Sequence, residues 1–217
     1  MKFFALKSSI FTIFVFALCS SVAFAQNSTE INRSEVFVGY SFFNSGLFNN
    51  DEAVAFSVEK RGSAHGINAS YARNFHRYIG AKVDYSYHRG DVKPTGPNGT
   101  DGAGIEMHQL VAGIQLKENK KNGWRFKPFG HAMIGVGSQT IDFRNLPGCV
   151  NCKRSSTGFA TVLGAGVDLE VNEHIDVRVI QFDYNTFSRN AQNDAFFGTI
   201  PGRTEKNARI SIGVVFH

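Results

Sequence analysis

A set of ionisable and amide side chains stands at alternate positions of otherwise apolar segments, where they would share one interior. The set comprises Lys82, Asp84, Gln109, Lys127, Asp168, Glu170, Arg178, Asp183 and Arg209. Acids and bases are nearly balanced, and an isolated buried ion is costly, so we expect salt bridges among them. Such a network could fill and fix an interior, or it could gate a narrow path for protons or ions.

A Cys-x-x-Cys pair, Cys149 and Cys152, forms a second candidate site. One pair supplies two ligands, whereas a structural zinc site takes four. Lys153 stands where c-type haem attachment would place histidine. A disulfide within an external loop is the favoured interpretation, with metal binding and redox chemistry as alternatives. We expect no metal and no cofactor.

Histidines could serve as catalytic bases, for example in an enzyme that modifies lipid A. Such an enzyme needs a nucleophile beside a base that a third group orients. The histidines are scattered through the chain, at positions 65, 76, 88, 108, 131, 174 and 217. His131 and Ser138 share a predicted strand, but seven residues of extended chain separate them by roughly 23 Å. We predict no enzyme and no catalytic residue, and a site formed between strands stays an alternative.

The elements that position these residues are segments of alternating apolar and polar side chains. The predicted strands are 35–43, 65–75, 78–88, 105–117, 124–138, 157–171, 175–187 and 207–216. In the third segment, Ile79, Ala81 and Val83 fall on one face. Lys82 and Asp84 fall on the other. Period-two alternation gives a strand one apolar and one polar face, and eight such strands can close into a barrel filled by side chains. The predicted fold is therefore an all-β, antiparallel, up-and-down barrel of eight strands.

Two strands depart from regular alternation. In the seventh, Val179 and Phe182 would fall on opposite faces although both are apolar. A β-bulge near Ile180 and Gln181 would restore the pattern. In the fifth, Pro128 cannot donate a backbone hydrogen bond, which predicts a bulge or irregular pairing there.

Alternation does not distinguish a soluble barrel from a membrane barrel, but the N-terminus does. Lys2 and Lys7 precede an apolar core at 10–18 and a small-x-small site at 23–25. Residues 1–25 are therefore predicted to be an export signal that is removed, which leaves 26–217 as one barrel domain. No later stretch reaches the 18 or so apolar residues that a membrane helix requires.

The connections and the C-terminus favour an outer membrane. Short links are expected at 75–78, 118–123 and 172–174, and long ones at 44–64, 89–104, 139–156 and 188–206. Outer-membrane barrels have short periplasmic turns and longer external loops. The last strand closes on the aromatic Phe216, followed by His217, which predicts a signal for the outer-membrane assembly machinery. The predicted location is the outer membrane of a Gram-negative-type bacterium, in contact with its lipid.

Net charge gives no indication of a nucleic-acid partner. The formal charge is +5, and removal of Lys2 and Lys7 would lower it to +3. That excess is too small to predict binding to nucleic acid, and export makes such a partner less suitable still. The 22 glycines and 13% aromatic residues are typical of a chain of strands and turns.

Short sequence runs across the chain after residue 25 carry a family resemblance. They are EVFVGY at 35–40, NAS at 68–70, GAKVD at 80–84, KPFGHA at 127–132, GAGVD at 164–168, VRVIQFDY at 177–184 and RISIGVVF at 209–216. In their order and in the closing strand, the chain resembles the OmpA-like family of small, porin-like outer-membrane β-barrel domains. The resemblance implies a membrane-embedded barrel with a plugged, ionisable interior. The full OmpA architecture also has a periplasmic, peptidoglycan-binding domain after the barrel. The resemblance extends only to the eighth strand, so that binding role is not carried over.

Several functions are compatible with this fold, because one fold can support many roles. The first hypothesis is a non-enzymatic barrel with a structural role in the envelope. The second is a small or gated channel. The third is surface adhesion, in which the long loops bind an extracellular ligand, and the fourth is a lipid A-modifying enzyme.

Overall fold

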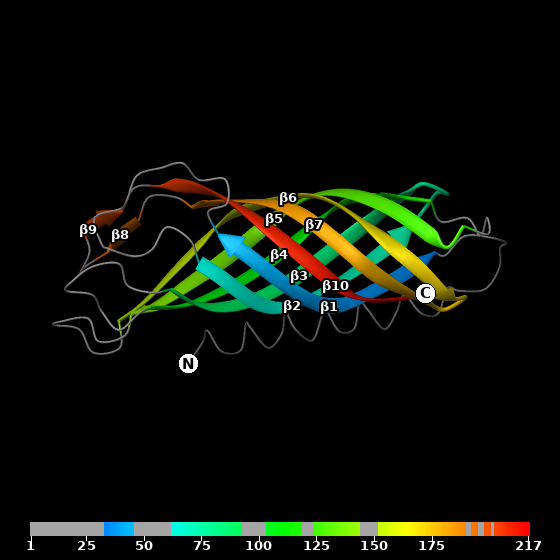
Figure 1. The fold of residues 1–217 in the computed structure, drawn as a ribbon. Helices are drawn as coiled ribbons and strands as arrows, with labels where there is room; N and C mark the ends of the chain where they lie inside the picture. The colour runs from blue at the N-terminus through cyan, green and yellow to red at the C-terminus, as the bar shows by residue number, and fades with distance from the viewer. Residues whose placement is uncertain are drawn as a thin grey trace, which may run out of the picture. The chain divides into compact units, whose positions relative to one another are not determined.

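Antiparallel strands close into an eight-stranded barrel in the order β1-β10-β7-β6-β5-β4-β3-β2 (Figure 1). The strands are β1 (Ser34–Ser45), β2 (Gly62–Asn74), β3 (Ile79–Val92), β4 (Ala103–Lys117), β5 (Phe126–Phe143), β6 (Cys152–Asn172), β7 (Ile175–Arg189) and β10 (Arg203–Phe216). A separate two-stranded sheet, which the sequence did not predict, pairs β8 (Gln192–Asp194) with β9 (Gly198–Ile200). This computed structural model describes residues 33–45, 62–92, 103–118, 124–143, 152–189, 192–194, 198–200 and 202–217. The predicted fold class is confirmed.

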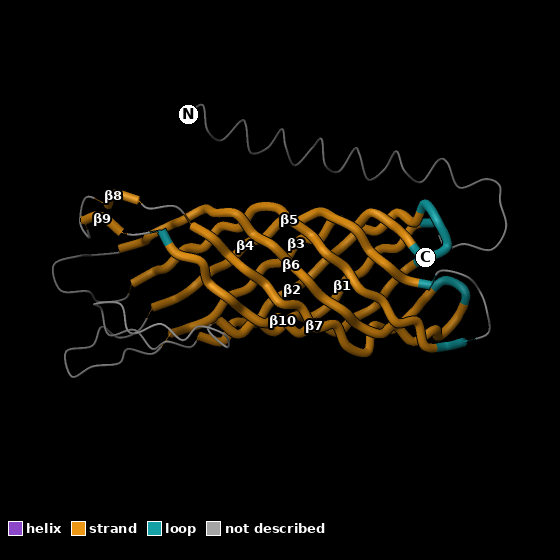
Figure 2. The backbone as a smooth tube through the Cα atoms, turned by 90° about the horizontal axis from the view of Figure 1, so that it is seen from above, coloured by secondary structure: helices purple, strands orange, loops and turns teal. Residues whose placement is uncertain are grey.

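The strands are tilted against the long axis of the barrel (Figures 1 and 2). Directly paired residues can be followed from strand to strand once around the barrel. Starting at Val215 on β10, this route ends on the same strand at Glu205, nearer the loops. Between them it passes through Phe37, Ser70, Asp84, Val111, Gly135, Ala160 and Phe187. This stagger is what a closed barrel of tilted strands requires. As a result, residues that meet across the interior come from different positions along the ladder.

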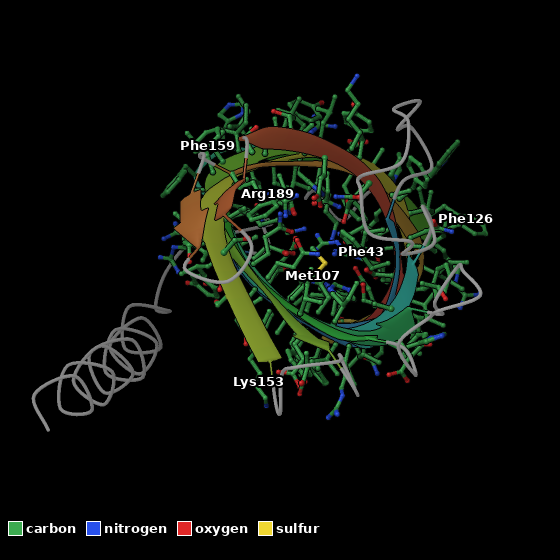
Figure 3. All side chains as sticks on the ribbon, turned by 90° about the vertical axis from the view of Figure 1, so that its left-hand side faces the viewer. Phe43, Met107, Phe126, Lys153, Phe159 and Arg189 are labelled. Atoms are coloured by element: carbon green, nitrogen blue, oxygen red, sulfur yellow. The ribbon has the colours of Figure 1, made fainter. Side chains whose placement is uncertain are left out.

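The two faces of the wall have opposite chemistry. The outward face carries large apolar side chains such as Ile134 and Leu163, which are 61% and 64% exposed. The inward face carries ionisable side chains such as Asp84 and Arg209, which are at most 1% exposed. Seen along the barrel, Phe43 lies inside the ring of strands, whereas Phe159 lies outside (Figure 3). An apolar exterior around a polar interior is the arrangement of a membrane barrel. No helix in the described part of the chain is long and apolar enough to cross a membrane.

The strands extend further toward the loops than the sequence predicted. The expected connection 139–156 shrinks to 144–151, because β5 runs to Phe143 and β6 starts at Cys152. It is therefore no longer than the connection 118–125 on the opposite side. Polar cross-strand pairs stabilise the added length, for example Thr140 Oγ1, which donates to Ser155 Oγ at 3.3 Å. Alternation of apolar residues does not detect such a polar extension.

The two predicted irregularities had different outcomes. The bulge in β7 is confirmed, because Val179 and Ile180 are both exposed and the β6–β7 register shifts between Val167 and Asp168. The prediction of irregular pairing at Pro128 was wrong, since Pro128 pairs in regular register with Val167 on β6. Register with β4 begins only at the next residue, so Pro128 has a neighbouring strand on one side. Pro128 thus occupies an edge position, where a strand tolerates proline, because no β4 residue pairs with it.

Closure of the ladder predicts resistance to detergent. β1 pairs with β10 from Val36–Phe216 to Ser45–Asn207, which leaves no free sheet edge over that length. Protein from an outer-membrane fraction is expected to migrate faster in an SDS gel when unheated than after boiling. Absence of a shift, with the protein in a soluble fraction, would contradict the closed membrane barrel.

Candidate functional site

The ionisable residues singled out by the sequence lie on the inward face of the barrel. Lys82, Asp84, Lys127, Asp168, Arg178, Asp183 and Arg209 are all buried. Gln109 and Glu170 are half-buried on the same face. The described interior thus concentrates the charged side chains that alternation had sorted to one side of each strand.

The first cluster joins four strands near the short turns. Lys117 Nζ donates to Glu35 Oε2 at 3.1 Å and to Asp168 Oδ2 at 2.8 Å. Arg178 holds Asp168 with two hydrogen bonds, from Nε at 2.8 Å and from Nη2 at 3.0 Å. All four side chains are at most 3% exposed. Two-pronged pairing of arginine with a carboxylate fixes both groups in position.

The Arg178 guanidinium lies against two aromatic rings, one from β1 and one from β5. Its Cζ lies 4.3 Å from the ring centroid of Phe37 and 4.1 Å from that of Phe129. Cation–π contact of this kind becomes stronger where water is excluded. A glycine makes room for one ring, because a Cβ on Gly166 would lie 2.5 Å from Phe129 Cζ. The inward glycine is therefore needed to seat the aromatic–arginine stack.

Gln181 connects this cluster to a second one. Its Oε1 accepts from Arg178 Nη1 at 2.7 Å, and its Nε2 donates to Asp183 Oδ2 at 2.7 Å. Asp183 Oδ2 also accepts from Arg209 Nε at 2.7 Å, and Arg209 Nη2 forms an ion pair with it at 2.6 Å. The β7 bulge makes this possible, because it returns Gln181 to the inward face after Arg178.

The second cluster reaches the opposite wall. Arg209 Nη1 donates to Asp84 Oδ1 at 3.0 Å, and Asn68 Nδ2 donates to the same oxygen at 2.9 Å. His131 Nε2 lies 2.9 Å from Asp183 Oδ1. A chain of hydrogen bonds therefore runs without interruption from Glu35 on β1, through β4, β6, β7, β10 and β3, to Asn68 on β2.

The last residue, His217, lies in the interior at the end of the barrel near the short turns. His217 Nε2 lies 2.9 Å from Asp176 Oδ2, and its side chain is 4% exposed. Lys127 Nζ contacts Asp176 at 3.4 Å and Glu170 at 2.8 Å. The residue after the terminal aromatic thus packs into the interior, as part of the same ion-pair network.

Sequence reasoning missed several members of the network: Glu35, Asn68, Lys117, His131, Asp176 and His217. The predicted bulge had already placed Gln181 inside the barrel. For Lys117, His131, Asp176 and His217 the missed signal was parity, since each stands an even number of residues from a recognised inward residue of the same segment. Glu35 and Lys117 were passed over because they lie at strand ends. There, the sequence does not indicate whether an ion reaches the interior or the water outside.

A serine–histidine pair lies between strands in the interior. Ser41 Oγ is 2.9 Å from His88 Nε2, and Ser211 Oγ donates to Ser41 Oγ at 3.0 Å. Within the described chain no carboxylate is hydrogen-bonded to His88, so a third, orienting group is missing. Ser41 is fully buried and His88 is 2% exposed, which leaves no access for a lipid substrate. The described residues also contain no group of three or more side chains suited to a metal ion.

The remaining predicted positions are the cysteine pair and the terminal aromatic. Cys149 lies outside the described residues, and Cys152 opens β6 opposite Phe143, so the loop disulfide stays a prediction. Phe216 faces outward, is 47% exposed and closes the barrel against Val36. Its role in assembly likewise stays a prediction.

Comparison with known proteins agrees with this geometry. A family model described as the outer membrane protein beta-barrel domain matches residues 12–217. The chain therefore belongs to this family, and its location is the outer membrane. A search of curated proteins finds no match.

Solved structures of small outer-membrane barrels share the fold. Neisserial surface protein A is 14% identical, with a TM-score of 0.56 over 84% of this chain and 96% of its own. OprG from Pseudomonas aeruginosa is 16% identical, with a TM-score of 0.51 over 87% and 97%. Ail, the attachment invasion locus protein of Yersinia pestis, solved with the heparin analogue sucrose octasulfate, is 14% identical, with a TM-score of 0.50 over 87% and 100%. At these identities the likeness concerns the fold.

Proposed function

We propose that the protein is a non-enzymatic, structural barrel of the outer membrane whose interior is sealed by the ion-pair network. The observation that carries the proposal is the uninterrupted chain of hydrogen bonds from Glu35 to Asn68. An eight-stranded barrel is only wide enough for side chains, whereas broad aqueous channels belong to barrels of about 16 strands.

The energetics of buried ions support a fixed plug over an easily opened gate. Opening a path would require separation of pairs such as Asp183–Arg209, in which both side chains are fully buried. Removing one partner from a buried pair costs about 3–5 kcal/mol, because the other charge is left uncompensated. The network therefore favours a single closed arrangement, in which the barrel contributes rigidity to the envelope.

Solute flux tests this proposal against a small or gated channel. Vesicles containing the purified wild-type protein are expected to release a small entrapped solute no faster than protein-free vesicles. A general porin with a wide channel, reconstituted in the same way, provides the positive control. Flux through the wild-type protein at the rate of the porin would overturn the structural role.

A second candidate function is binding of an extracellular ligand through the loop side. It is supported by β6, which continues toward the loops beyond its last pair with β7, Gly158–Arg189. Lys153 on this extension is 66% exposed. The likeness in fold to Ail, solved with a polysulfated ligand, agrees with such a role. Deletion of residues 46–61 is expected to abolish attachment of expressing cells if that loop binds the ligand, and unchanged attachment would contradict it.

Assembly in the membrane is proposed to depend on the last strand. Phe216 ends this strand with its side chain exposed to the outside of the barrel. Phe216→Ala is expected to reduce the amount of folded protein in the outer membrane, measured by the heat-dependent gel shift. The matched change Phe159→Ala, at a similarly exposed outward aromatic near the loop side of the barrel, is expected to have a smaller effect.

A further inference from the structure

Polar side chains on the outward face gather along the loop-side border of β1 to β4. On β2, β3 and β4, the outward residues His65, Arg89 and His108 follow directly on the apolar band. Their next outward neighbours toward the short turns include Ile67, which is 57% exposed, and Leu110, which is 43% exposed. This border is the level at which a membrane barrel meets lipid headgroups.

Register brings these side chains together. His65 pairs directly with Arg89, and His108 pairs with Tyr87, the preceding outward residue of β3. The rings of Tyr87 and His108 are 4.8 Å apart. Directly paired side chains on one face of a sheet lie within contact distance. His65, Arg89 and His108 therefore form one outward cluster across three adjacent strands.

Two tyrosines orient the imidazoles. Tyr85 Oη lies 2.9 Å from His108 Nδ1, and Tyr40 Oη is hydrogen-bonded to His65 Nδ1. A phenol is the stronger hydrogen-bond donor of each pair, so each imidazole accepts at Nδ1 and carries its hydrogen on Nε2. Among the described residues, neither Nε2 has a hydrogen-bond partner. Each ring thus presents a donor to the outside.

The remaining charge in the cluster is weakly paired. Arg89 Nη1 lies 3.7 Å from Glu106 Oε1, and the two side chains are 67% and 43% exposed. An exposed pair at this distance contributes little, so Arg89 can exchange Glu106 for a stronger anion. Arginine matches phosphate with paired hydrogen bonds.

The opposite side of the border carries different side chains. Its outward hydroxyl groups bond to one another, as in Ser188–Thr204 at 2.8 Å and Thr161–Thr186 at 2.5 Å. The barrel is therefore asymmetric at headgroup level. Among the described residues, one side carries imidazole and guanidinium groups, whereas the other carries hydroxyl groups bonded to one another beside the exposed Lys206.

We propose that His65, Arg89 and His108 bind the phosphate of a lipid headgroup in the outer leaflet. A lipid is the occupant because the cluster faces away from the barrel, directly above the apolar band, where the membrane surrounds an outer-membrane protein. Binding there would fix the rotation of the barrel relative to its lipid shell. It requires no opening of the interior and is independent of the sealed lumen.

Native mass spectrometry of the folded protein in detergent, titrated with lipid A carrying its phosphates, tests this site. Arg89→Ala with His108→Ala is expected to raise the dissociation constant at least about tenfold, as loss of charge-assisted hydrogen bonds should. The matched control Ser188→Ala with Thr204→Ala should bind as wild type does. Glu106→Gln is expected to tighten binding, since it removes the carboxylate that competes for Arg89.

Three outcomes would overturn the proposal. They are equal binding of dephosphorylated lipid A, unchanged affinity in the Arg89 and His108 variant, and capture of inorganic phosphate with the affinity of lipid A. The heat-dependent gel shift of each variant verifies that the barrel is folded, and the altered side chains face outward, so the interior network is left intact.

Discussion

Arg178→Ala is expected to lower the free energy of unfolding by about 3–5 kcal/mol, because it removes the two-pronged partner of the buried Asp168 carboxylate, which then keeps Lys117 alone. Arg178 holds Asp168 with two hydrogen bonds, bonds to Gln181 and lies between the rings of Phe37 and Phe129. Urea titration of the protein in lipid vesicles measures the change. Fluorescence of Trp124, the only tryptophan, reports on unfolding, since its side chain is 73% exposed beside β5.

Two comparisons isolate the cause of this loss. Arg178→Ala combined with Asp168→Ala is expected to be less damaging than the sum of the single changes, because the carboxylate that loses Arg178 is removed with it. Lys153→Ala breaks an exposed pair with Asp142 at 3.2 Å and should cost about 0–1 kcal/mol. A loss below about 1 kcal/mol for Arg178→Ala would show that the network does not hold the barrel together.

Gly164→Ala is expected to give the second large effect, through steric conflict inside the network. A Cβ at this position would lie 2.0 Å from Asp183 Oδ1 and 2.6 Å from His131 Nε2. Asp183 cannot move aside freely, because Arg209 holds it with a hydrogen bond and an ion pair. Overpacking of this kind costs about 1–3 kcal/mol, and displacement of Asp183 from Arg209 would add to that loss.

The matched control for this substitution lies on the neighbouring strand. A Cβ on Gly130 would meet only the carbonyl oxygen of Gly164, at an ordinary 3.7 Å. Gly130→Ala is therefore expected to fold like the wild type. Equal yields of heat-shifting protein for Gly164→Ala and Gly130→Ala would contradict the close packing around Asp183.

Much of the wall follows from the sequence because alternation is a local property. The inward set from Lys82 to Arg209, and the phase change in β7, can be read from residues two apart. The outward placement of apolar side chains such as Leu163 then fixes register, because a slip of one residue would turn every side chain to the wrong face.

Pairing across the interior is not local, so the sequence does not provide it. Arg209 meets Asp84 although 125 positions separate them, and Lys117 meets Glu35 over 82. Such contacts depend on tilt and stagger, which arise only when β1 closes against β10. The polar extensions of β5 and β6 and the inward turn of His217 were missed for a similar reason, since polar residues at strand ends carry no apolar signal.

Single-channel recording in a planar bilayer tests the sealed interior most directly. The wild-type protein is compared with the double variant Asp183→Ala with Arg209→Ala, which removes one acid and one base from the centre of the network. We expect no unitary current steps from the wild type and resolved steps from the folded double variant. Steps of the same size from both proteins would contradict a barrel plugged by these ion pairs.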